Sequence, residues 1–174
     1  MSTENALVTL LREGVSVQEA SLDSKRDLED ALRSACNDFI EHSSFKMAGP
    51  MLGFVDAYKS TISLQTADIK DEPFMKADAV IKVMNDTKDS LQSQVEHTKR
   101  QMSVYLESAA TRSILLKPVT RKISKSLEDA KRFVTDVEEY EANGWDSTTK
   151  AQVLDSAQDL ESLLKVLVVS KSSR

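Results

Sequence analysis

The chain has 174 residues, 40% hydrophobic and 29% charged, so it is long enough for one domain with a hydrophobic core and far from a disordered composition. Its 4 glycines and 3 prolines allow few tight turns, which favours long helices with short connections. One cysteine excludes an internal disulfide framework and predicts a reducing, cytoplasmic location.

The apolar runs predict neither a secretory signal nor a membrane span. The opening sequence MSTENALVTLLREG lacks the basic region of a signal peptide. The best apolar run, LLKVLVV at 163–169, is far shorter than the ~18 residues of a spanning helix. We therefore expect the chain to work outside the bilayer.

Two helical stretches are predicted before residue 66. A short amphipathic helix covers 1–14 and ends at Gly14. The sequence SVQE that follows is typical of a capping box, with Ser16 as the N-cap of a second stretch over 16–66. Gly49-Pro50 predicts a bend in that stretch, because proline lacks an amide hydrogen and its ring crowds the preceding turn.

One long helix is predicted over 73–143, because Pro73 suits the first helical position and apolar residues then recur about every 3.5 residues. Four polar residues interrupt this seam: Lys88, Thr98, Arg112 and Ser126. A period held this long is typical of coiled-coil packing. The candidate assembly seam consists of Ile81, Met84, Leu91, Val95, Met102, Tyr105, Leu116, Val119, Ile123, Phe133 and Val137.

Pro118 lies in the middle of this predicted helix. The apolar register passes through it without a change of phase, and Lys117 is a poor N-cap residue, so a bend is favoured over a break. The alternative is a true break, which would give two antiparallel helices over 74–117 and 118–143. The two interpretations predict an extended rod and a compact bundle, respectively.

The sequence EANGWDS at 141–147 predicts the end of the long helix. Gly144 suits a left-handed C′ position, Trp145 can pack back on the last turn, and Asp146 or Ser147 can cap a final helix over 147–170. No alternating pattern of a strand is present. The predicted fold is all-α, a single domain over 1–174 that forms an antiparallel bundle or coiled coil of long helices, one of them kinked or broken at Pro118.

The residues that carry chemistry in enzymes are sparse and scattered. Two histidines and one cysteine, with no close pairing, give no zinc signature. No glycine-rich phosphate loop is present, and acidic pairs such as Glu138-Glu139 fit helix surfaces. We therefore predict a protein that is not an enzyme, with no catalytic residue, metal or cofactor.

A basic stretch stands out in an otherwise acidic chain. Residues 97–132 contain nine lysines or arginines and three acids, against a net charge of −5 for the whole chain. Such a stretch predicts contact with an acidic protein partner or an anionic membrane, or else a solvated face. Nucleic acid is not favoured, because aromatic residues do not interleave with the basic ones. The candidate interaction face is Lys117, Arg121, Lys122 and Lys125.

These features predict a helical scaffold module that mediates protein–protein assembly, as a subunit of a larger complex or as a homodimer. The first alternative is a membrane-surface module, because the layout of 16–142, with long helices and a basic face near Pro118, resembles that of BAR domains; the resemblance implies contact with curved membranes. The second alternative is a compact adaptor similar to vinculin-like or tethering-complex-like bundles, with Pro118 as a helix break.

Overall fold

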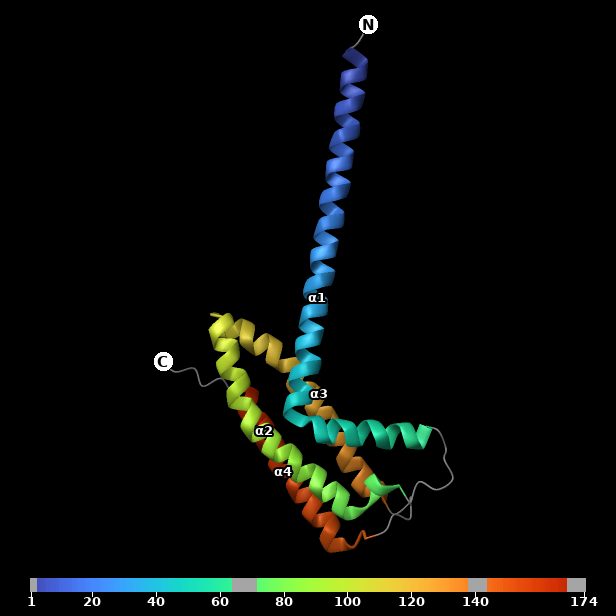
Figure 1. Ribbon diagram of the computed structural model, residues 1–174, viewed down its shortest axis with the longest axis vertical. Coiled ribbons are helices and arrows are strands. Elements are labelled where there is room, and N and C mark those ends of the chain that lie inside the picture. The colour runs from blue at the N-terminus through green and yellow to red at the C-terminus, as the bar shows by residue number, and fades with distance from the viewer. Residues whose placement is uncertain (1–2, 64–71, 138–143, 169–174) are drawn as a thin grey trace. The chain divides into compact units, whose positions relative to one another are not determined.

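The computed structural model describes residues 3–63, 72–137 and 144–168, and these residues form four α-helices and one short 3-10 helix (Figure 1). The helices are α1 (Thr3–Ser63), α2 (Ala77–Tyr105), α3 (Ala109–Asp136) and α4 (Ser147–Val168), with η2 (Pro73–Met75) before α2. No described residue lies in a strand. The predicted all-α fold is confirmed.

The chain divides into two compact units, Met1–Phe39 and Ile40–Arg174, where the sequence predicts one domain. The described part of the first unit is the N-terminal part of α1, and its side chains from Leu22 to Ala35 are exposed. A single helix has no second layer against which to bury a core. The hydrophobic core that the composition predicts therefore lies within the second unit.

Helix α1 differs from the two stretches predicted for this region. It runs through Gly14 and Ser16 without interruption, because one glycine inside a helix costs only about 1 kcal/mol. The predicted bend is present but centred on Ala48, whose φ of −141° and ψ of 27° are not helical. Pro50 lies inside the helix, and its clash with the preceding turn is relieved two residues upstream.

The predicted long helix over 73–143 is divided, and the division is not at Pro118. Helix α2 ends at Tyr105, and α3 begins at Ala109 after a connection of three residues (Figure 1). Pro118 lies well inside α3 and does not end a helix. The periodicity concealed the division, because both helices bury the same heptad positions on either side of a connection that preserves the phase. The end of the predicted helix, 138–143, lies outside the described residues.

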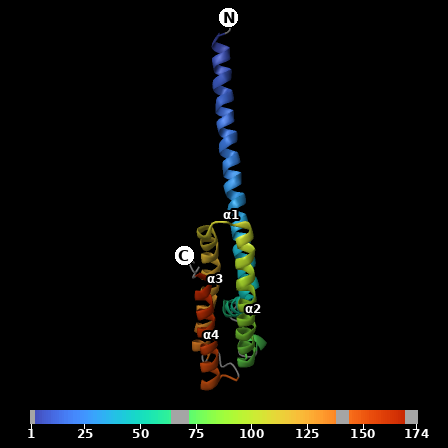
Figure 2. The same cartoon turned by 90° about the vertical axis from the view of Figure 1, so that its left-hand side faces the viewer.

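In the second unit, α2 and α3 form a helical hairpin and α4 packs against both of them (Figures 1 and 2). Helix α3 runs opposite to α2 and α4, so the arrangement is an antiparallel bundle. Ion pairs join α4 to its neighbours: Lys88 to Asp159, at 2.7 Å, and Lys131 to Glu161. Helix α4 buries Val153, Ala157, Leu160 and Leu164, whereas Leu154 is 40% exposed.

The centre of the core is Phe133, a fully buried residue of α3. Its ring packs edge-on against Phe54 and Tyr58 of α1, with centroids 5.1 and 5.0 Å apart, and against Trp145 at 5.7 Å. Such edge-to-face aromatic pairs add about 0.5–1.5 kcal/mol to the burial of the rings. One side chain therefore connects α1, α3 and the start of α4.

The connection into α4 shows the predicted left-handed glycine and the predicted cap of α4, whereas the predicted helix end at 143 lies outside the described residues. Gly144 has a φ of 86°, in the left-handed region that favours glycine. Trp145 packs on Phe133, in the last turn of α3, and its Nε1 donates a hydrogen bond of 2.9 Å to the Met75 carbonyl. The Asp146 carboxylate accepts a hydrogen bond of 2.7 Å from the Thr149 amide and so caps α4.

We expect Phe133→Ala to lower the free energy of unfolding by about 3–5 kcal/mol, because a large buried ring is removed from the junction of three elements. Phe45 is the matched control: it is 68% exposed, and Phe45→Ala should change the free energy by about 0.5 kcal/mol or less. Urea denaturation followed by circular dichroism measures both. Equal losses for the two variants would contradict this account of the core.

The cap of α4 should make stability depend on pH. The backbone hydrogen bond from Thr149 lowers the pKa of Asp146 below its ordinary value of 3.8. A lowered folded-state pKa gives stability that is fully present above the unfolded pKa and is lost as the pH falls through the folded pKa. We therefore expect Asp146→Ala to reduce the urea midpoint at neutral pH, and the difference from the parent protein to shrink below about pH 3.8. Ser147→Ala, which removes no titrating group, should give a difference independent of pH.

Candidate functional site

The predicted basic face lies on α3, at the positions that flank Pro118. Lys117, Arg121 and Lys125 are exposed, whereas Lys122 is half-buried and forms an ion pair with Glu41 of α1. Turns of a helix place residues three and four apart on one face, so the three exposed cations form a row. With Ile114, Pro118, Thr120, Lys122 and Ser124, they line a shallow concavity of about 620 Å³.

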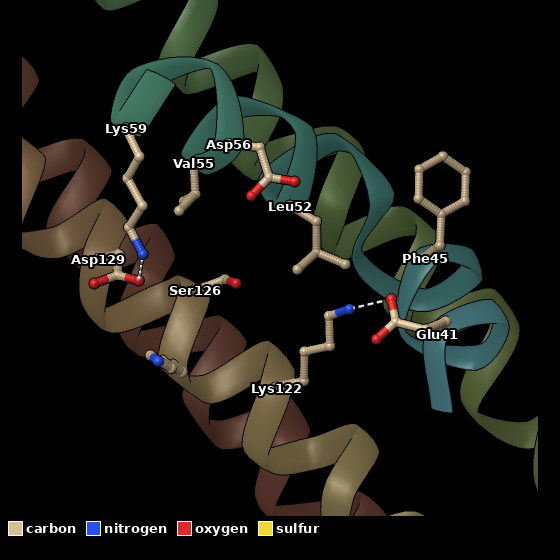
Figure 3. Close-up of a pocket in the computed structure, with 10 residues that line it drawn as sticks. Glu41, Phe45, Leu52, Val55, Asp56, Lys59, Lys122, Ser126 and Asp129 are labelled. Carbon is tan, nitrogen blue, oxygen red and sulfur yellow. Dashed lines mark hydrogen bonds and ion pairs between the residues drawn. The ribbon is translucent and has the colours of Figure 1, made fainter. Parts of the chain in front are cut away.

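A second concavity, a cleft of about 340 Å³, lies between α1 and α3 (Figure 3). Its apolar floor is formed by Leu52 and Val55 of α1, which are almost fully buried. Ser126 of α3 closes the opposite wall, and the ring of Phe45 stands exposed at one edge. The remaining lining residues are charged: Glu41, Asp56, Lys59, Lys122, Lys125 and Asp129.

Two ion pairs bridge the walls of this cleft. Lys122 contacts the Glu41 carboxylate near one end, and the Lys59 ammonium lies 2.5 Å from Asp129 Oδ2 near the other (Figure 3). The Asp129 side chain is only 14% exposed, so this pair is better shielded from water and salt than an ordinary surface pair. The pairs fix α1 on α3 electrostatically as well as by apolar contact.

The lining of the cleft is suited to holding helices together. It contains no histidine or cysteine, so it lacks the usual partners of an activated nucleophile. In the ranges that the structure covers, no three or more metal-binding side chains cluster. Cys36 is a half-buried free thiol of the first unit, and both His42 and His97 are exposed on separate helices.

The predicted assembly seam is placed mostly in the core of the chain itself. Nine of its eleven residues are buried, Ile81 is half-buried, and Tyr105 is 83% exposed at the end of α2. These nine residues pack α2 and α3 within the bundle, so their surface is not free for a partner. The buried nine are Met84, Leu91, Val95, Met102, Leu116, Val119, Ile123, Phe133 and Val137.

The four polar residues of the seam are accommodated in two ways. Lys88 reaches out to Asp159 of α4, and Arg112 donates through Nη1 to the carbonyls of Leu106 and Glu107 in the connection before α3. Thr98 and Ser126 are small enough to be buried. Of the four polar residues, Lys88 therefore forms an ion pair between α2 and α4, and Arg112 stabilises the turn before α3.

The turn between α2 and α3 is a feature that the periodicity did not predict. Ser108 is its N-cap, and its hydroxyl accepts a hydrogen bond of 3.3 Å from the Thr111 amide. A serine before two alanines was the available sequence signal for a helix start. The cleft could not be found in this way, because Lys59 and Asp129 are 70 residues apart and neither lies in a recognisable motif.

Within the ranges that the structure describes, no helix combines the length and the apolar content needed to cross a membrane.

Comparison with known proteins identifies a related family. A family model described as the COG3 C-terminal cap domain matches residues 31–164, about three quarters of the chain. The match contains the cleft, the basic face and the α2–α3 turn, and it ends at Leu164 in α4. Every element of the described bundle in the second unit therefore falls within the matched range or overlaps it.

Curated relatives carry the name conserved oligomeric Golgi complex subunit 3. The protein from Drosophila melanogaster is 22% identical over 149 residues, which cover 78% of this chain and 16% of that protein. The protein from Homo sapiens is 29% identical over 131 residues, which cover 72% of this chain and 16% of that protein. The chain thus spans about one sixth of the length of these relatives. No solved structure matches it.

We expect the Lys59–Asp129 pair to contribute a coupling energy of about 0.5–1 kcal/mol, at the upper end for exposed pairs, because Asp129 is mostly shielded from water. A double-mutant cycle with Lys59→Ala and Asp129→Ala, followed by urea denaturation, measures it. The control cycle is Lys25→Ala with Glu29→Ala, a pair within one helix whose side chains are 74% and 62% exposed, and it should give about 0.3 kcal/mol. A coupling energy of zero for Lys59 and Asp129 would contradict the electrostatic role of the cleft.

Proposed function

The chain belongs to the COG3 C-terminal cap domain family, and on this premise we propose that it is a non-enzymatic helical module of a multisubunit complex. The relatives are named as subunits of a conserved oligomeric Golgi complex, which supports such a role for this chain. The proposed partners are other protein subunits, and the proposed place of action is the cytoplasmic side of the Golgi. This proposal names the kind of complex in which the scaffold function predicted from the sequence would operate.

The observation that carries the proposal is the exposed apolar face of the first unit. Leu28 and Leu32 lie one helical turn apart and are 69% and 64% exposed. Ala35 and Phe39 continue the same face at spacings of three and four. An isolated helix is marginally stable in water, and helices of proteins are stabilised mainly by burying an apolar face.

A helix of another subunit is the occupant that fits this face. The spacing of four, three and four residues is that of a coiled-coil seam, which pairs with a second helix by interlocking side chains. The residues around this face carry charges of both signs: Glu29 pairs with Lys25, and Arg33 follows Leu32.

We expect the purified chain to have a mass near 19.3 kDa in light scattering and to co-purify with subunits of the Golgi complex when it is expressed with a tag in cells. Leu28→Ser with Leu32→Ser should weaken this association about a hundredfold or more, because burial of each leucine contributes about 1.5–3 kcal/mol. Quantitative immunoblotting of the co-purified subunits measures the loss.

Leu154→Ser is the control, since Leu154 is 40% exposed on α4, and it should leave the association unchanged. A chain of twice the monomer mass that dissociates on Leu28→Ser with Leu32→Ser would identify a second copy as the partner and overturn the heteromeric assembly. Absence of Golgi complex subunits from the purified material would contradict the proposal as a whole.

A further inference from the structure

The end of the α2–α3 hairpin presents apolar side chains to solvent. Val104 and Tyr105, in the last turn of α2, are 76% and 83% exposed, and Ile114 of α3 is 64% exposed. These three residues are named the apolar tip. No residue between 103 and 115 is buried, although the helices on both sides contribute fully buried residues to the core. Large exposed apolar groups gathered at one end of a bundle are a feature of binding surfaces.

The exposure of the apolar tip is maintained by an ordered turn. The Leu106 amide closes the last turn of α2 with a hydrogen bond of 2.8 Å to the Met102 carbonyl. Ser108 caps α3, and Arg112 bonds to the carbonyls of Leu106 and Glu107. The backbone groups of the turn are therefore satisfied locally, and the projecting side chains are held in place.

The surroundings of the apolar tip are strongly basic. Residues 99–125 contain seven lysines or arginines and one acid, Glu107, which gives a net charge of +6 in a chain of net charge −5. Lys117, Arg121 and Lys125 form no ion pair with any residue that the structure describes. Their charges remain available for a ligand.

The exposed cations and the apolar side chains are adjacent on α3. Ile114, Lys117, Arg121 and Lys125 follow one another at spacings of three and four residues, and they line the same concavity as Pro118. The concavity is shallow and its lining lies on α3 alone, so it offers no second wall to enclose a partner helix. The apolar groups of a protein-binding site, by contrast, are usually enclosed in well-packed pockets.

We propose that the apolar tip and the basic face of α3 together bind an anionic lipid surface. The apolar side chains would enter the boundary between headgroups and acyl chains, where the amphipathic ring of Tyr105 is favoured. Lys117, Arg121 and Lys125 would contact the lipid phosphates, each contributing about fivefold to the binding constant. This site is separate from Leu28 and Leu32 and goes beyond the proposed role in a complex.

Flotation of the purified chain with vesicles tests the proposal. We expect binding to vesicles of phosphatidylcholine and phosphatidylserine at low ionic strength, weaker binding as salt is raised, and little binding to phosphatidylcholine alone. Val104→Ser with Tyr105→Ser should weaken binding about tenfold or more, because apolar insertion is removed. Lys117→Gln with Arg121→Gln and Lys125→Gln should weaken it about a hundredfold.

Leu154→Ser and Lys82→Gln are the matched controls, because both residues are exposed on other parts of the bundle, and both variants should bind as the parent does. Circular dichroism verifies that each variant is folded. Absence of binding at low ionic strength would overturn the proposal. Weaker vesicle binding by the variant of Lys117, Arg121 and Lys125, together with unchanged binding by the variant of Val104 and Tyr105, would equally overturn the proposal. Attraction by charge alone would then explain the binding. Loss of complex subunits in the co-purification experiment has no bearing on these outcomes.

Discussion

The packing of Phe133 is the constraint on which the arrangement of the bundle depends. Its ring is fully buried on α3 and contacts the rings of Phe54 and Tyr58 of α1 and of Trp145, in the segment before α4. Phe54, one of those partners, also packs at a centroid distance of 6.4 Å on Phe74, next to the start of α2. Side chains of α1, η2, α3 and the segment before α4 therefore meet at one cluster, and Trp145 also donates a hydrogen bond to the Met75 carbonyl of η2. The cleft, the basic face and the hairpin end are positioned by the helices that this cluster unites.

The distribution of charge within the second unit follows from this arrangement. Cations near the cluster are used in the bundle: Lys59 and Lys131 pair with acids on neighbouring helices. Cations farther along α3 toward the hairpin end, at Lys117 and Arg121, face solvent. Helix α3 thus contributes Lys131 to an ion pair at one end and leaves Lys117 and Arg121 exposed toward the other. The acidic residues that would neutralise the exposed group are absent from 108–127.

The two proposed surfaces suit a module that connects components. The leucine face of the first unit is uncharged at its centre and has the spacing of a helix-pairing seam, so it favours a protein helix. The hairpin end combines projecting apolar groups with unpaired cations, so it favours an anionic lipid surface. The two surfaces use different residues, so a substitution in one leaves the residues of the other unchanged.

The sequence by itself determined the helical class, the apolar faces and the local caps, because these depend on residues within a few turns of one another. The kink near Gly49-Pro50, the left-handed Gly144 and the Asp146 cap were predictable for this reason. Nine of the eleven residues predicted as an assembly seam are buried within the bundle. Only the tertiary structure decided what those residues pack against. The heptad phase continues through the 106–108 turn, so periodicity could not distinguish one rod that pairs with another chain from two helices that fold back on α4. The cleft, formed by ion pairs between residues 70 and 81 positions apart, likewise arises only when α1 docks on α3.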